Sequence, residues 1–186
     1  MRVTERVHES LKNFVNLGDI VIDATVGNGH DALFLAQLVG PTGHVYAFDI
    51  QQEALDATAA LLGSHGILHY TTIRRDHAEL ATAIPPQHRG RIAAVVFNLG
   101  WLPGGNRNIT TAPGTTFAAL HAARSVLRIE GIITVVIYRM HLDGPLEAEA
   151  VLETVIGWSR QGDAVFIGPA NDQSMPQLVT AVKMRP

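Results

Sequence analysis

The residues with the clearest chemical potential lie in the stretch DATVGNGHDALFLA, residues 23–36. Gly27 and Gly29 stand one residue apart, between an apolar run that ends at Asp23 and a second apolar run. Because glycine has no Cβ, a ligand can approach the backbone closely at such a place. A helix that begins there would also present free N–H groups. The pattern therefore indicates a ligand-binding turn between a buried strand and a helix.

A second acid favours a ligand that contains a ribose. Asp49 lies 20 residues after Gly29 and ends the next apolar run. A carboxylate at this place can accept hydrogen bonds from both ribose hydroxyls. The turn also fits G-x-G-x-x-A, with Ala32 in the third position, so NAD is an alternative. Asp23 argues against NAD, because a carboxylate there would repel a pyrophosphate but suits a ligand with a cationic amino-acid end.

These features resemble the first motif of class I S-adenosylmethionine-dependent methyltransferases, D-x-G-x-G-x-G, in which Thr25 here replaces the first glycine. By analogy, Asp23 and the backbone of Gly27 and Gly29 would face the methionine part of S-adenosylmethionine. Asp49 would hold its ribose. In the segment RRDHAEL, Asp76 or His77 would border the adenine, and the alternative is a solvated helix cap.

A further group of residues could act on an amine. Asn98 follows an apolar run in AAVVFNLGWLPGG, residues 93–105. Methyl transfer to an amine depends mainly on positioning the reactants. We expect Asn98 to orient the amine and Trp101 to stack on the substrate. The structural alternative is that Asn98 ends a strand and Trp101 only packs.

An open α/β sheet would bring these residues together, since ligands bind beyond the carboxyl ends of its strands. Val- and Ile-rich runs predict parallel strands that are buried on both faces, with helices on both faces of the sheet. No helical pattern separates the last two strands, which favours a closing antiparallel hairpin. The seven expected strands are Ile20–Ala24, His44–Phe48, Ile67–Ile73, Ile92–Phe97, Ile132–Ile137, Ala164–Ile167 and Leu178–Val182. The expected helices include Thr4–Asn16, Gln51–Leu62, Thr115–Leu127 with Thr115 or Thr116 as N-cap, and Pro145–Trp158.

Composition limits the classes of protein. The 186 residues fit one domain, residues 1–186, and no apolar run is long enough for a membrane span. The chain has no cysteine, which excludes disulfides and fits a cytoplasmic protein. Its net charge of -3 implies that any contact with nucleic acid is local and small.

Four segments together give a more specific resemblance: DATVGNGHDALFLA, VYAFDIQ, FNLGWLPGGN and IYRMHLDG. They are similar to the YtqB-like methyltransferases, a family also described as rRNA methylases, over essentially the whole chain. The resemblance implies a Rossmann-like class I methyltransferase fold and S-adenosylmethionine as cofactor. It also implies methylation of the amine of 5-aminomethyl-2-thiouridine at the wobble position of the tRNA anticodon loop. The site residues that it implies are Asp23, Asn28, Gly29, His30, Asp31, Asp49, Gln51, His77, Asn98, Gly100, Leu102 and Gly105.

The chain departs from the family pattern in the region that would meet the substrate. Trp101 stands where the family usually has Tyr, and Asn106 stands where an acidic residue is common. Arg139 and Met140 precede the later histidine, where the family often has a small residue. These differences bear on which nucleoside is recognised.

Other polar residues are candidates for substrate contact. His30 could contact the ligand carboxylate or the substrate, and His141 could take a proton or contact a phosphate. Arg107 and Arg139 are candidate phosphate contacts or solvated loop charges. His65 and His69 have H-x-x-x-H spacing but lie in an expected loop, so we expect no metal site.

The sequence therefore favours a methyltransferase acting on an RNA base amine, with the tRNA wobble uridine as the target. One alternative keeps this chemistry but acts on ribosomal RNA or a small-molecule amine. Another is an NAD-binding oxidoreductase or a non-catalytic nucleotide sensor. Because the chain is small, a homodimer in which a second subunit adds RNA-binding surface is also considered.

Overall fold

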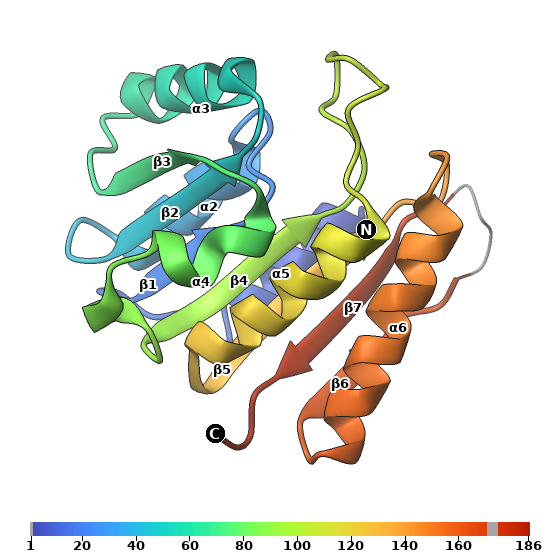
Figure 1. The fold of residues 1–186 in the computed structure, drawn as a ribbon. Helices are drawn as coiled ribbons and strands as arrows, with labels where there is room; N and C mark the ends of the chain where they lie inside the picture. The colour runs from blue at the N-terminus through green and yellow to red at the C-terminus, as the bar shows by residue number, and fades with distance from the viewer. Residues whose placement is uncertain (1, 171–174) are drawn as a thin grey trace.

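Seven strands form one sheet in the computed structural model, which describes residues 2–170 and 175–186. Their order across the sheet is β3-β2-β1-β4-β5-β7-β6 (Figure 1). The first five strands run parallel, and β7 lies antiparallel between β5 and β6. The fold predicted from sequence, including the antiparallel hairpin, is confirmed. The strands are β1 (Ile20–Asp23), β2 (His44–Asp49), β3 (Tyr70–Arg74), β4 (Ile92–Asn98), β5 (Leu127–Ile137), β6 (Ala164–Ile167) and β7 (Gln177–Val182).

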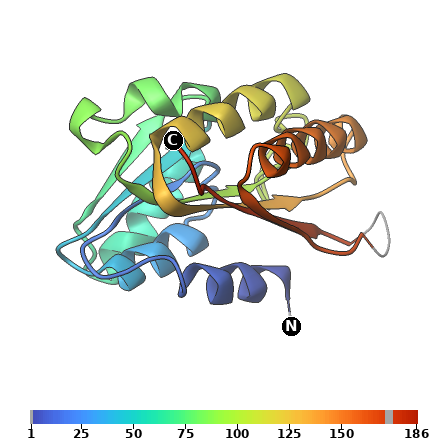
Figure 2. The same ribbon diagram turned by 90° about the horizontal axis from the view of Figure 1, so that it is seen from below.

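Helices cover both faces of this sheet, as Figure 2 shows. One face carries α1, α2 and α3, and the other carries α4, α5 and α6 with two short 3-10 helices. The helices are α1 (Val3–Leu11), α2 (His30–Val39), α3 (Gln52–Ser64), η1 (His77–Glu79), α4 (Leu80–Ala83), η2 (Pro86–His88), α5 (Pro113–Val126) and α6 (Gly144–Arg160).

The central strand β4 explains why the sheet needs both layers. Residues 92–97 are all buried. Val95 and Phe97 belong to the core under α5 and α6, whereas Val96 belongs to the core under α1, α2 and α3. A strand with apolar side chains on both faces is stable only when both faces are covered.

Three boundaries differ from the sequence expectation by more than two residues. The first helix ends at Leu11 rather than Asn16, and Arg128 Nη2 donates to the Phe14 carbonyl that a longer helix would use. Strand β3 begins at Tyr70 rather than Ile67. Strand β5 begins at Leu127 rather than Ile132, because Leu127 pairs with Ile92 before an irregularity in the register, after which Ile132 pairs with Ala94.

Helix α5 also begins differently. Ala112 is its N-cap and Pro113 stands in the first turn, so the expected caps Thr115 and Thr116 lie inside the helix. Proline suits this place because its missing N–H would have no helical partner. The same rule predicted Pro145 in the first turn of α6 correctly. The hairpin loop predicted between β6 and β7 includes residues 171–174, which lie outside the described residues.

The turn from β1 into α2 is held against α3. Gly29 is the N-cap of α2 and has a φ of 82°. A Cβ atom there would lie 2.8 Å from Thr58 Oγ1 and 2.9 Å from Thr58 Cα. Thr58 Oγ1 in turn donates to the Gly27 carbonyl. The turn can approach α3 this closely only without a side chain at position 29.

We predict that Gly29→Ala destabilises the protein by about 2 kcal/mol or more, since it combines a left-handed backbone with overpacking. Gly63→Ala is the matched control, because Gly63 lies in α3 with open space around its Cβ position. That control should be neutral or slightly stabilising. Chemical denaturation of both variants measures the difference, and equal stabilities would contradict the packing argument.

Candidate active site

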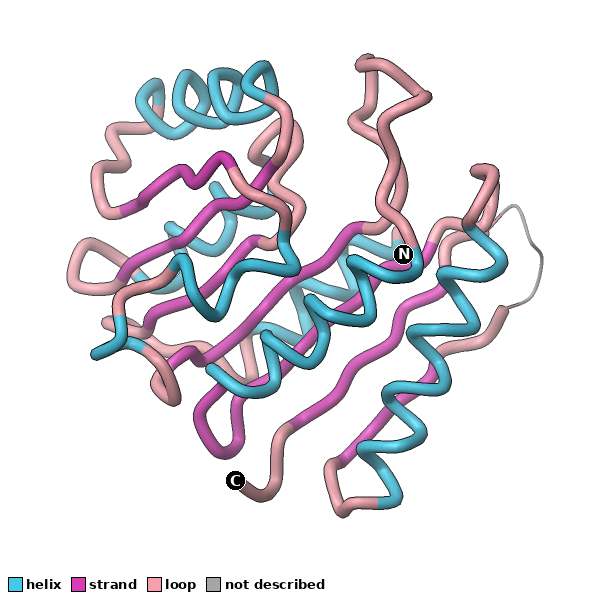
Figure 3. The backbone as a smooth tube through the Cα atoms, viewed as in Figure 1, coloured by secondary structure: helices cyan, strands magenta, loops and turns pink. Residues whose placement is uncertain are grey.

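A cavity of about 730 Å³ lies at the carboxyl ends of the parallel strands. This volume is within the range of small-molecule binding sites. Its walls come from the ends of β1, β2, β3 and β4, from α1, and from the loop between β4 and α5, residues 99–112, here called the arm. The arm rises above the sheet edge in Figure 1 and is drawn as loop in Figure 3. The predicted site residues that line the cavity are Thr25, Gly27, Asn28, His30, Asp31, Asp49, Gln51, Asp76, His77, Asn98, Gly100, Trp101 and Leu102.

Six predicted site residues do not line the cavity. Asp23 ends β1 and Gly29 is the N-cap of α2, whereas Gly105 and Arg107 lie in the arm. Arg139 and His141 follow β5. The sequence therefore predicted which segments form the site more fully than which side chains reach the cavity.

The ribose position predicted for Asp49 has suitable geometry. Asp49 Oδ2 accepts a hydrogen bond from Gly27 N at 3.0 Å, and Oδ1 accepts one from Gln51 N at 2.9 Å. These two donors fix the carboxylate at the cavity wall. Since an ionised carboxylate has about four lone-pair sites, capacity remains for the hydroxyls of a ribose.

Asp23 is buried beneath the same turn. Its Oδ1 accepts from Thr25 N at 3.3 Å, and its Oδ2 has no hydrogen-bond partner among the described residues. Burial raises the pKa of Asp23 well above its ordinary value, and the charges of Asp31 and Asp49 raise it further. A buried carboxyl oxygen without a partner is suited to a cationic group of a ligand.

Asp76 and His77 lie at the β3 end of the cavity. Asp76 Oδ1 accepts from Ala78 N at 2.8 Å and so caps η1. His77 is buried with its ring edge-on to Phe97. Burial lowers the pKa of His77, which favours the neutral imidazole. Contact of either residue with the adenine stays a prediction, and the cap that was its alternative is present for Asp76.

Asn98 is held by two contacts at the end of β4. Its backbone N donates to Thr25 Oγ1 at 2.7 Å, so the threonine that replaces the motif's first glycine has a defined partner. Its side-chain Nδ2 donates to Asp31 Oδ2 at 2.6 Å. Because only the amide nitrogen can donate to a carboxylate, this contact assigns Oδ1 as the free acceptor.

Asp31 has a second partner that the sequence did not indicate. His8 Nε2 lies 2.6 Å from Asp31 Oδ1, and the His8 ring stacks on Phe34 with 3.8 Å between centroids. His8 comes from α1 and lines the cavity. Nothing in the local sequence distinguishes His8 from a surface histidine, because its partner is 23 residues away.

The arm places Leu102 over the glycine turn and holds Trp101 at the cavity wall. Trp101 pairs with Thr110 across the arm, and the Arg107 guanidinium lies 5.6 Å from the Trp101 ring centroid. A Cβ atom on Gly27 would lie 3.3 Å from Leu102 Cδ1. A Cβ atom on Gly105 would lie 3.0 Å from Leu102 Cδ2. Glycine at both positions lets Leu102 approach the turn.

A buried carboxylate supports the base of the arm. Glu147 on α6 accepts from Thr111 Oγ1 at 2.8 Å and from Thr116 Oγ1 at 2.5 Å. Thr111 Oγ1 also accepts from Gly100 N. His141 Nε2 lies 3.2 Å from Glu147 Oε2, and its ring meets the Trp101 ring edge-on. From this place His141 would act through Trp101, so its catalytic role stays a prediction.

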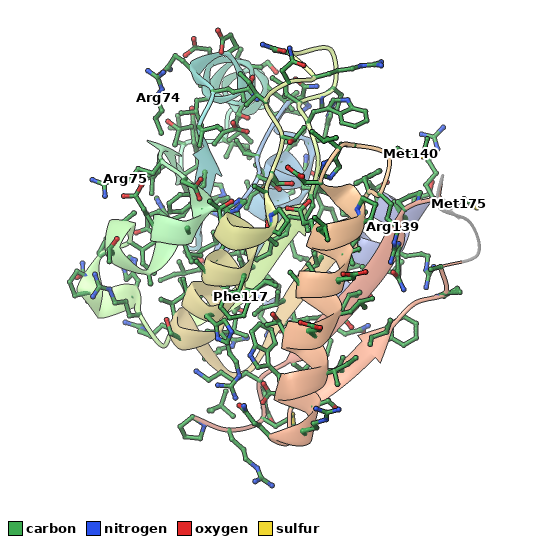
Figure 4. All side chains as sticks on the ribbon, turned by 45° about the vertical axis from the view of Figure 1, so that its right-hand side comes forward. Arg74, Arg75, Phe117, Arg139, Met140 and Met175 are labelled. Carbon is green, nitrogen blue, oxygen red and sulfur yellow. The ribbon has the colours of Figure 1, made fainter. Side chains whose placement is uncertain are left out.

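Arg139 is directed toward the last strand. Its Nη2 donates to Gln177 Oε1, so part of its donor capacity is used within the protein. Figure 4 shows Arg139 and Met140 on one side of the arm, with Arg74 and Arg75 on the other. Contact of Arg139 with RNA phosphate also stays a prediction.

Comparison with known proteins identifies the family. Residues 45–183 match the family model described as "Putative rRNA methylase". The chain belongs to this family. It is 38% identical over 159 residues to the chloroplastic tRNA (mnm(5)s(2)U34)-methyltransferase of Arabidopsis thaliana, which covers 81% of this chain. The chain spans 57% of that relative's length.

Solved structures agree with this membership. The structure of a "putative rRNA-methylase" from Clostridium thermocellum has a TM-score of 0.92 and 38% identity, covering 99% of this chain and 98% of that one. A "putative methyltransferase" from Streptococcus mutans, solved in complex with SAH, has a TM-score of 0.86 and 32% identity over 99% of each chain. The chain is an S-adenosylmethionine-dependent methyltransferase.

The cavity fits this cofactor. Asp49 offers acceptors for a ribose, the Gly27 turn permits close approach, and the charges of Asp31 and Asp49 at the cavity wall favour a positively charged ligand. Among residues 2–170 and 175–186 no cluster of three metal-ligating side chains occurs. His65 and His69 contact the Leu61 and Ala36 carbonyls respectively. No described helix is long and apolar enough to cross a membrane.

We predict that Asp49→Ala weakens S-adenosylmethionine binding by about 1.5–3 kcal/mol, the cost of losing hydrogen bonds to a charged group. Isothermal titration calorimetry on the folded variant measures this loss. Asp56→Ala, an exposed acid on α3, is the control. Unchanged affinity in Asp49→Ala would overturn the ribose assignment.

A second prediction follows from the raised pKa of Asp23. The unfolded chain ionises this carboxyl above about pH 4, whereas the ligand-free folded protein disfavours the ionised form. The stability that Asp23 contributes is therefore present at low pH and is lost as the pH rises toward its folded pKa. Asp23→Asn removes this loss, so it should stabilise the ligand-free protein at pH 7 and have little effect near pH 4.

Thermal unfolding at both pH values tests this prediction. A gain of about 1 kcal/mol corresponds to roughly 2–4 °C in a protein of this size. Asp23→Asn should also weaken S-adenosylmethionine binding, because the group of carboxylates around Asp31 and Asp49 loses one charge that attracts the positively charged cofactor. A variant less stable than the wild type at pH 7 would show that the ionised carboxylate is already compensated.

Proposed function

We propose that this methyltransferase transfers the methyl group to the primary amine of 5-aminomethyl-2-thiouridine, or its 2-oxo counterpart, at the tRNA wobble position. The product is the 5-methylaminomethyl nucleoside. The observation that carries this proposal is the orientation of Asn98, whose Oδ1 is free to accept a hydrogen bond from an amine at the cavity.

The surroundings of Asn98 favour an amine rather than a hydroxyl. Asp31 lies in direct contact with Asn98, and Asp23 and Asp31 are close enough for their charges to interact. A site with these carboxylates attracts a cation, and an aminomethyl group is cationic before it reacts. The name of the Arabidopsis relative gives the same amine class.

Trp101, three residues after Asn98 in the sequence, also lines the cavity and offers an aromatic face for a base. A wobble base in an anticodon loop can be unstacked and inserted into such a cavity, whereas a base in an A-form duplex cannot reach it. Asn98 would hold the amine and Trp101 the pyrimidine. Positioning of this kind supplies a large part of the rate of such a displacement.

Cationic side chains near the cavity could meet the loop phosphates. Arg2 and Arg75 line the cavity, and Arg107 lies on Trp101. With a net charge of -3, the chain has few further contacts to offer. We expect about two to four neutralised phosphates, and therefore a shallow salt dependence of tRNA binding. A homodimer that adds RNA-binding surface remains part of the proposal.

Ribosomal RNA is the second candidate substrate, and the family description favours it. The same amine chemistry would apply to a ribosomal base. A short stem-loop is the more suitable substrate, because in a chain of 186 residues the surface around the cavity has to recognise the whole RNA. The Streptococcus mutans relative was solved with S-adenosylhomocysteine, which argues against an NAD-dependent oxidoreductase and against a nucleotide sensor.

The proposal is tested with purified enzyme, S-adenosylmethionine and tRNA that carries 5-aminomethyl-2-thiouridine. Nucleoside mass spectrometry should show a gain of one methyl group on that nucleoside. The controls are the same tRNA with unmodified uridine at the wobble position, and ribosomal RNA. Methylation of ribosomal RNA alone would replace the proposal with the second candidate.

We predict that Asn98→Ala lowers turnover by about 10²-fold or more, the scale of a lost positioning group. Its affinity for S-adenosylmethionine should change little, because the amide acts on the amine. Single-turnover kinetics and calorimetry measure the two quantities separately. Turnover within a few-fold of wild type would mean that Asn98 only ends the strand.

A further inference from the structure

His8, Asp31 and Asn98 form a continuous hydrogen-bonded chain along the cavity wall. Asp31 accepts from Asn98 Nδ2 at 2.6 Å with one oxygen and lies 2.6 Å from His8 Nε2 with the other. The three residues come from α1, α2 and the end of β4. All three line the cavity. Tertiary packing alone assembles them.

The proposed reaction has a requirement that this chain of residues can meet. A primary alkylamine has a pKa near 10, as lysine does, so it enters the site as an ammonium at neutral pH. An ammonium nitrogen has no lone pair and cannot attack the methyl carbon. The enzyme therefore has to remove one proton from the substrate before the new bond forms.

We propose that His8, held by Asp31, accepts this proton and passes it to solvent. The inference rests on the proposed amine substrate. The ammonium donates hydrogen bonds to Asn98 Oδ1 and Asp31. For the transfer the His8 ring carries its own hydrogen on Nδ1, so Nε2 is the basic nitrogen 2.6 Å from Asp31 Oδ1. One proton passes from the ammonium to the carboxylate and on to Nε2, and the Nδ1 hydrogen then leaves to solvent. The freed nitrogen lone pair then forms the bond to the methyl carbon while the electrons of the carbon–sulfur bond stay on sulfur. The product leaves as a secondary ammonium.

The surroundings of His8 suit this role. Its side chain is 27% exposed, against 13% for Asp31, so a proton can leave to solvent from His8 more readily. Phe34 stacks on one face of the ring and fixes its orientation. Asp31 stands in the first turn of α2, where the helix N-terminus stabilises a negative charge.

Other titratable groups face this pair from the packed elements. Asp23 on β1 lies close enough for its charge to interact with Asp31. Tyr138, after β5, is half-buried, and its pKa is raised by burial and then by Asp31. Within α1, Glu5 accepts from Arg2 N, and Lys12 pairs with Glu9. His141 is a weaker candidate acceptor, because it does not line the cavity and faces Glu147.

The test uses His8→Gln, whose amide can hydrogen-bond to Asp31 but cannot take a proton. At pH 7 its single-turnover rate on aminomethyl tRNA should fall by about 10²-fold, the lower end for lost acid–base catalysis. The rate should approach that of the wild type near pH 10, where solution already deprotonates the amine. Calorimetric affinities for S-adenosylmethionine and for the tRNA should stay within about two-fold. Asp31→Asn is a second variant, which keeps the acceptor for Asn98 and should show the same recovery at high pH.

The matched control is His65→Gln. His65 is an exposed histidine at the end of α3 that contacts the Leu61 carbonyl and none of His8, Asp31 and Asn98. It should retain the wild-type rate and pH profile. A loss in His8→Gln that is equal at every pH, or that comes with weaker binding, would mean that His8 only supports the wall and would overturn the inference. A wild-type enzyme inactive on this tRNA at every pH would defeat the proposed function itself. An active wild type with an unchanged His8→Gln profile would defeat only the proton-acceptor role.

Discussion

The close packing of the first glycine turn against α3 is the constraint on which the site depends. Gly29 can approach Thr58 only because it has no side chain, and Thr58 fixes the Gly27 carbonyl. Gly27 N then donates to Asp49, which joins the end of β2 to the end of β1. A shift of this turn would move the acceptors for the cofactor, the start of α2 and the carboxylate of Asp31 together.

This arrangement concentrates negative charge at one edge of the sheet. Asp23, Asp31 and Asp49 interact electrostatically, and the pKa of Asp23 is raised as a result of burial and of its two neighbours. Such a cluster is unfavourable without a ligand. It becomes favourable when a positively charged methyl donor and an ammonium substrate enter, since each offsets part of the repulsion. The same electrostatics thus connects the raised pKa of Asp23 to the recognition of a positively charged ligand.

The arm depends on a different buried carboxylate. Glu147 accepts from Thr111 and Thr116, and Thr111 accepts from Gly100 N. These contacts join the two ends of the arm to α5 and α6, below Trp101. The cofactor side of the cavity is therefore set by glycines and strand ends, whereas the substrate side is set by polar contacts between helices. The departures from the family at Trp101, Asn106, Arg139 and Met140 fall on or beside this second side.

The sequence by itself determined the sheet, the glycine turn and the positions of Asp49 and Asn98. These follow from short-range patterns: buried strands leave continuous apolar runs, and a residue that ends a parallel strand must lie at the ligand-binding edge. Only the tertiary structure decided the contacts of His8 and Glu147, because their partners are 23 residues or more away in the sequence. It also decided that Arg139 and His141 lie off the cavity. Side-chain direction after a strand depends on packing against other elements, and no local pattern encodes that packing.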